Sequence, residues 1–284
     1  MKNSLIPVLA GLGLCFAQFT ALAQHESKTH VSKEFTLKSG VVAVYNVFGS
    51  INVEGYAGDK VIMEIDQTIL ADDAQTLEDG KKEFKLAFDE RSDTVMAYIA
   101  SPQDSRPHNH YHDWDGDRRI EYKYVLNFTI KVPYQSSLHI STVNEGNIVV
   151  KNVHGSLHVN NVNGGIEIDN AKGATYAHTV NGPVTVSYLS APNDDSSYYT
   201  INGKMNITYP ANLAADLEFK SMNGQFYTDF DDVEVLPTKI TKTAAKGNSG
   251  TIYKLSKNED VRVGAGGKLF KFETLNGNIY IKKQ

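Results

Sequence analysis

The chain has 284 residues, of which 41% are hydrophobic, so it can bury a core as one large domain or two small ones. Its formal net charge of −5 argues against nucleic acid as a partner, because nucleic-acid binding needs a basic surface. Cys15 is the one cysteine and lies in an N-terminal apolar run, so no disulfide is expected in the rest of the chain.

The first 23 residues have the pattern of a signal peptide. Lys2 supplies positive charge, an apolar run covers residues 5–17, and Ala21-Leu22-Ala23 is an A-x-A cleavage site. A membrane anchor is the alternative, but the run is short for a spanning helix. Leu14 before Cys15 disfavours a lipidated cysteine, which needs a small residue there. We predict cleavage near Ala23, export to the periplasm, cell surface or medium, and no transmembrane segment in the mature chain.

Residues 24–133 are predicted to form an N-terminal β-rich region with one short helix. Alternating apolar residues mark its strands, most clearly over residues 120–132, where every second residue is apolar before Pro133 ends the run. The helix is predicted over residues 72–80 (DDAQTLEDG), with an aspartate to cap its start and Gly80 to close it.

A nine-residue unit repeats through the second region, residues 134–284. Four gapless copies fill residues 153–187, and each places a glycine before a short alternating strand. Two units span 18 to 21 residues, and Asn-Gly corners alternate with other corners at that period. This alternation predicts a stacked β-solenoid. The predicted structural corners are Asn163, Gly164, Asn181, Gly182, Asn202, Gly203, Asn223, Gly224, Asn276 and Gly277.

The chemistry of these corners predicts ladders of identical residues. Asparagine tolerates the left-handed conformation and glycine adopts it freely, so both suit a tight corner. Stacked corners would align Asn above Asn, with Asn181 in the middle of the ladder and Asn276 at its end. Asn-Gly is also a strong signal for β-hairpins, so an antiparallel sandwich or barrel remains the alternative fold.

The repeated units resemble the bacterial putative adhesin family, a β-strand repeat domain of unknown function with repeated T-φ-N-G units. The resemblance covers residues 34–283 and includes the segment 61–100, Val132-Pro133 and the closing unit at residues 272–279. It implies a right-handed β-helix-like solenoid in an exported or envelope protein, and it carries over no catalytic residues. A His-rich insert and a long spacer after Asn223 depart from the family pattern.

An enzyme is not predicted. Some β-helices cleave acidic polysaccharides, which needs grouped carboxylates or a cationic group beside a general base. Glu167 and Asp169 share one predicted strand, but the aligned units place no further carboxylate beside them. Arginine is absent between Pro133 and Val261. The combination of base, partner and electrophile is therefore not met.

The His-rich insert at residues 102–119 is a candidate metal site. His108, His110 and His112 alternate and are followed by Asp113. In an extended segment such residues lie on one face, about 6.5–7 Å apart, and can converge on Zn²⁺ or Cu²⁺ if the loop bends. A solvated surface loop is the alternative, because a His-rich tract is a compositional signal only. No cofactor is expected beyond adventitious Zn or Cu.

Three tyrosines, Tyr176, Tyr227 and Tyr280, are predicted to face outward and are candidates for stacking on glycans, although tyrosine is common in strands anyway. We expect an exported, non-catalytic cell-envelope or surface protein that binds an envelope component, a glycan or a protein through the long solenoid face, as an adhesin does. A structural or stress-related envelope scaffold without a ligand is the alternative, and a carbohydrate-active β-helix enzyme is a third.

Overall fold

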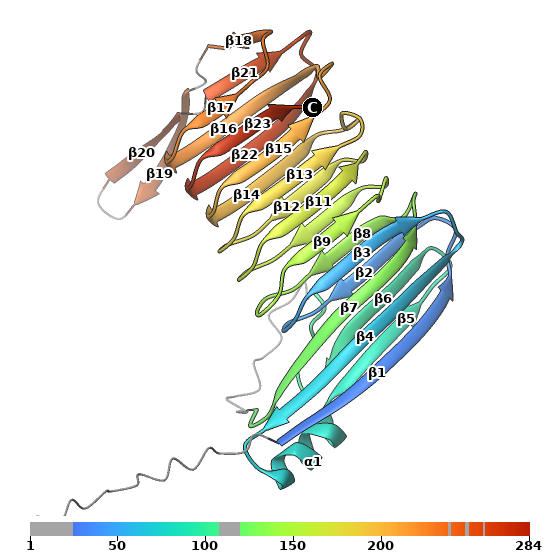
Figure 1. The fold of residues 1–284 in the computed structure, drawn as a ribbon. Helices are drawn as coiled ribbons and strands as arrows, with labels where there is room; N and C mark the ends of the chain where they lie inside the picture. The colour runs from blue at the N-terminus through green and yellow to red at the C-terminus, as the bar shows by residue number, and fades with distance from the viewer. Residues whose placement is uncertain (1–24, 108–119, 238–239, 248–249, 258) are drawn as a thin grey trace, which may run out of the picture.

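The computed structural model describes residues 25–107, 120–237, 240–247, 250–257 and 259–284, with the backbone alone between residues 240 and 259. The described residues form an all-β protein with two large mixed sheets and one helix (Figure 1). Within these ranges no helix has the length and apolar character needed to cross a membrane.

The first sheet has ten strands in the spatial order β1-β4-β7-β3-β9-β11-β13-β15-β23-β17. Parallel pairing runs from β7 to β17, and β1, β4 and β7 pair antiparallel. The strands are β1 (His25–Thr36), β3 (Ile51–Tyr56), β4 (Lys60–Ala71), β7 (Lys123–Pro133), β9 (Ile148–Lys151), β11 (Ile166–Ala171), β13 (Val184–Tyr188), β15 (Met205–Tyr209), β17 (Phe226–Thr228) and β23 (Ile279–Lys283).

The second sheet has eleven strands in the order β18-β21-β16-β22-β14-β12-β10-β8-β2-β6-β5, and a separate two-stranded sheet joins β19 to β20. The strands are β2 (Val41–Tyr45), β5 (Lys85–Glu90), β6 (Thr94–Ser101), β8 (Ser137–Ser141), β10 (Leu157–Asn160), β12 (Thr175–His178), β14 (Ser196–Asn202), β16 (Ala215–Asn223), β18 (Val233–Val235), β19 (Ile240–Gly247), β20 (Gly250–Lys257), β21 (Glu259–Val263) and β22 (Lys268–Asn276).

From β8 to β15 the chain alternates between the two sheets and adds one parallel strand to each in turn (Figure 1). The strands stay in register, so that Leu157 pairs with Leu138 and with Thr175, and Ile166 pairs with Ile148 and Val184. Inward residues therefore stack on inward residues, and one cluster of buried side chains runs through both sheets. Both sheets continue across Pro133, because β2 pairs with β8 and β3 pairs with β9.

The helix α1 (Ala74–Glu83) begins as the sequence predicts and ends later. The Asp73 carboxylate accepts a hydrogen bond from the Thr76 backbone N–H at 2.9 Å, which caps the first turn. Gly80 does not close the helix. It lies inside α1 against the Tyr122 ring, where an added Cβ would come within 2.7 Å of the ring. Gly80 is therefore explained by a tertiary contact, and the prediction that it ends the helix was wrong.

The C-terminal strands depart from sequence order. β22 lies between β14 and β16, and β23 lies between β15 and β17, so the last strand pair separates two earlier ones. The prediction that Asn276 ends the asparagine ladder was therefore wrong. Asn276 occupies an interior position between Asn202 and Asn223, and Asn223 is the last member.

Candidate binding face

The Asn-Gly corners lie in one row along the stack. The asparagine of each corner donates a hydrogen bond from its side-chain Nδ2 to the Oδ1 of the preceding asparagine in the row, at 2.7–2.8 Å, and the row begins at Asn144, which only accepts. Each interior amide therefore uses one donor and one acceptor within the row, which links neighbouring corners. In spatial order the row consists of Asn144, Asn163, Asn181, Asn202, Asn276 and Asn223.

The glycines of these corners are required for space. Gly164, Gly182, Gly203 and Gly224 do not have the left-handed backbone that the sequence analysis assumed. A Cβ added to Gly182 would overlap the carbonyl oxygen of Gly164, and the same clash recurs at the other three. Where a threonine lies two residues before the asparagine, its hydroxyl donates to one of these carbonyls, as when Thr179 Oγ1 donates to Gly164 O at 2.8 Å and Thr200 Oγ1 donates to Gly182 O at 2.9 Å.

A row of aromatic rings crosses the outer face of the second sheet, on β8, β10 and β12. The His139 and His158 ring centroids are 4.6 Å apart with planes at 68°, and His158 and Tyr176 stack at 4.5 Å and 15°. The His158 ring therefore stacks on one face of the Tyr176 ring and makes an edge contact with the His139 ring. The next residue in the row is Ser197 on β14, which is too small to cover the second face of Tyr176.

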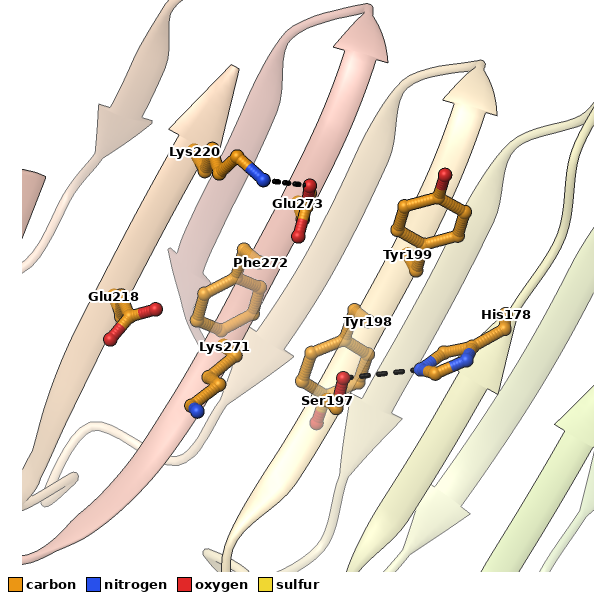
Figure 2. Close-up of a pocket in the computed structure, with 9 residues that line it drawn as sticks. All are labelled: His178, Ser197, Tyr198, Tyr199, Glu218, Lys220, Lys271, Phe272 and Glu273. Carbon is orange, nitrogen blue, oxygen red and sulfur yellow. Dashed lines mark hydrogen bonds and ion pairs between the residues drawn. The ribbon is translucent and has the colours of Figure 1, made fainter. Parts of the chain in front are cut away.

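A shallow depression of about 160 Å³ lies beside Ser197 (Figure 2). The imidazole of His178 approaches the Ser197 hydroxyl, with Nε2 to Oγ at 3.1 Å, and the Tyr199 ring follows at 5.8 Å from His178. On the far side lie the exposed ammonium of Lys271 and an ion pair between Lys220 and Glu273. We call this surface the ring face. It consists of the depression and the outward side chains of His139, His158, Tyr176, His178, Ser197, Tyr199 and Lys271.

Two imidazoles of the ring face, those of His158 and His178, favour the neutral form. Burial lowers the pKa of His158, and the neighbouring His139 and His178 lower it further. Burial also lowers the pKa of His178, against an opposing effect of Glu273. Near neutral pH the ring face thus offers ring surfaces, a hydroxyl and charged groups of both signs. Such groups suit a polar ligand with an apolar side.

The predicted glycan-stacking tyrosines do not form one site. Tyr227 and Tyr280 lie on the outer face of the first sheet and stack on each other at 5.0 Å and 10°. Tyr176 lies on the second sheet, in the ring face. The stacked pair covers one face of each ring, and Tyr227, on the edge strand β17, is 43% exposed.

Glu167 and Asp169, the two carboxylates singled out in the sequence, are not paired with a further carboxylate. Glu167 neighbours Val149 and Thr185, and Asp169 lies 4.0 Å from the Lys151 ammonium. Across the described part of the chain, no three His, Cys, Asp or Glu residues are grouped to hold a metal ion. The predicted ligands His108, His110, His112 and Asp113 lie outside the described residues.

Of the ring face, the sequence analysis named only Tyr176 and missed the histidines His139, His158 and His178 as well as Ser197, Tyr199 and Lys271. The signal was present, because Leu138-His139-Ile140 and Leu157-His158-Val159 place histidine at the same outward position of alternate units. Aligning the units that carry Asn-Gly corners recovers the first sheet only, whereas these histidines lie on the second.

No family model matches the chain, and no curated protein matches its sequence. Among solved structures, it is similar to a putative cell adhesion protein from Clostridium sporogenes, with 10% identity, a TM-score of 0.39 and coverage of 91% of this chain and 100% of that one. A putative adhesin from Bacteroides fragilis has 10% identity and a TM-score of 0.34 over 91% and 98% of the two chains. A putative lipid binding protein from Parabacteroides distasonis has 10% identity and a TM-score of 0.33 over 90% and 96%. Likeness this distant assigns neither family nor function to this chain.

Proposed function

We propose that this chain is an exported, non-catalytic protein of the cell envelope or cell surface that binds a glycan through the ring face, as an adhesin would. In this proposal the two-sheet stack is a β-solenoid of the right-handed β-helix type, with 18 to 21 residues per coil. A rigid solenoid offers a long face on which an extended polymer can lie.

The observation that carries the proposal is the depression beside Ser197, which is lined by aromatic, hydroxyl and charged side chains. A sugar ring has an apolar face and a polar rim. In the proposed mode, the apolar face packs on Tyr176 or Tyr199 and the rim hydroxyls meet His178, Ser197 and Lys271. The lysine and glutamate side chains at the far side of the depression provide charged hydrogen-bonding groups at its edge.

A glycan array with the mature protein tests the proposal, with each spot afterwards analysed for cleavage products. Retention of one glycan class without product is expected, and a His178→Ala/Tyr199→Ala variant should lose that retention. Tyr227→Ala on the opposite sheet is the matched control and should bind as the wild type does. Retention with cleavage would favour the enzyme, and absence of any retention would favour a ligand-free scaffold.

A further inference from the structure

The C-terminal strand pair, β22 and β23, occupies a slot between strands that precede it in the chain. The slot is bounded by β14 and β15 on one side and by β16 and β17 on the other (Figure 1). The chain therefore forms both walls of the slot from residues up to Thr228, and the occupant arrives from residues 268–283. The strands on either side of β22 and β23 are therefore not the strands that come directly before them in the chain.

Both walls recognise the occupant by the same groups. Asn276 donates to Asn202 Oδ1 at 2.7 Å on one wall and accepts from Asn223 Nδ2 at 2.8 Å on the other. Parallel backbone pairing accompanies both contacts, with Asn276 opposite each wall asparagine. Every one of these partners is an intrinsic part of the repeat, so an identical strand pair from another molecule would meet identical partners.

Burial of apolar side chains favours insertion of the strand pair into a slot. Phe270, Phe272 and Ile279 are each 1% exposed, and Ile281 is fully buried. The Phe272 ring stacks between Tyr198, at 4.9 Å, and Phe219, at 5.1 Å. A strand pair outside any slot would expose these apolar side chains to water, which is unfavourable in proportion to their area.

The connection into the slot has the composition of a hinge. β21 pairs with β16 on the side away from β22, so the chain must cross from one side of β16 to the other. Residues 264–267 (GAGG) make this crossing, with Gly264 at φ 55° and Gly266 at φ 72°. Glycine changes between such angles and extended backbone without a steric penalty, so this crossing can straighten.

We propose that the slot also accepts the β22–β23 pair of a second copy of this chain, which gives exchanged dimers hinged at residues 264–267. Exchange of an identical element remakes the contacts of β22 and β23 in the slot of the second copy, so the net loss is confined to the hinge. The inference concerns assembly and does not depend on the proposed glycan binding, because the test below uses neither the ring face nor a ligand.

Cysteine pairs placed across the slot test the exchange. Thr208 on β15 is opposite Lys282 on β23, outside the ring face. Neighbouring strands lie about 4.7–4.9 Å apart, within the Cα separation that a disulfide accepts. The mature chain as predicted has no cysteine of its own. We would therefore mix Thr208→Cys protein with Lys282→Cys protein, unfold and refold them together, and oxidise.

A disulfide-linked heterodimer is expected from this mixture. Glu167→Cys mixed with Thr185→Cys is the matched control, because β11 and β13 pair in chain order and should form no more heterodimer than random collision does. The double variant Thr208→Cys/Lys282→Cys verifies that the geometry permits the bond within one chain. Heterodimer at the control level, with the double variant crosslinked, would overturn the proposal. Light scattering on co-refolded wild type gives an independent reading: a doubled mass is expected, and monomer alone at every concentration would also overturn it.

Discussion

Glycine at position 182 is required by the close approach of the neighbouring corner rather than by its own backbone angles. Gly182→Ala should destabilise the protein by about 1–3 kcal/mol, because the new methyl group overlaps the Gly164 carbonyl and forces the coils apart. Urea unfolding measures the loss. Gly165→Ala, in the neighbouring Asn163-Gly164 corner, is the matched control, since its Cβ would first meet the Pro183 side chain at 3.3 Å. Equal losses in the two variants would contradict this account.

The asparagine row predicts a graded response to truncation. Asn181 and Asn276 each form two side-chain hydrogen bonds within the row, whereas Asn223 forms one. Alanine at either interior position should cost about 1 kcal/mol more than Asn223→Ala, at roughly 1 kcal/mol per hydrogen bond. The comparison by urea unfolding also tests the strand order, because a chain-ordered stack would make Asn276 the weakly held end.

For single residues, the sequence predicts where a residue lies in the fold better than it predicts why that residue type is needed there. Asn163, Asn181 and Asn202 can be placed at corners from their spacing alone, because the repeat is gapless there. The need for glycine beside them depends on how closely two backbones approach, which no single unit encodes. Similarly, Gly80 reads as a helix end, and only the Tyr122 ring, distant in sequence, explains it.

Among the strands, β13, β14 and β15 bring three tyrosine hydroxyls together inside the core. Tyr198 bonds to Tyr188 at 2.6 Å and to Tyr209 at 3.0 Å, and all three rings are fully buried. Burial raises the pKa of each hydroxyl well above its ordinary value of 10.0. The folded protein therefore keeps protons that the unfolded chain releases above pH 10.

This proton retention predicts alkaline destabilisation. The contribution of the three tyrosines to stability is complete below pH 10 and falls as pH rises from there towards their folded pKa values. Tyr198→Phe should make the fall shallower, because one of the three groups no longer titrates. Free energies of unfolding from urea melts between pH 8 and pH 11 give both slopes. An unchanged slope in Tyr198→Phe would contradict the assignment.

Strand order at the C-terminal end could not be predicted from the sequence. The units around Asn223 and Asn276 carry the same corner pattern, so either pairs equally well with Asn202 by local rules. The order observed depends on burial of Phe270 and Phe272 between existing strands, which is a long-range packing effect. The inward and outward faces of the strands were predictable, because strict alternation fixes them.

Viewed as a whole, the molecule presents two outer faces that differ in chemistry. The first sheet carries Glu167, Thr185 and Asn206 in one row, ending in the stacked tyrosines. The second carries the ring face and its depression (Figure 2). The proposed function assigns ligand binding to the second face. A substitution that fills the depression should therefore lower the affinity, and an equivalent substitution on the first sheet should not.

Affinity for the glycan class found on the array, measured by titration calorimetry on two tyrosine variants, tests this assignment most directly. Ser197→Tyr would place a ring opposite Tyr176 and fill the depression, whereas Thr185→Tyr adds the same side chain at an outward position of the first sheet. We predict that Ser197→Tyr weakens binding at least about tenfold, or roughly 1.4 kcal/mol, and that Thr185→Tyr binds as the wild type does. Unchanged affinity in a folded Ser197→Tyr variant, or equal losses in both, would contradict binding at the ring face.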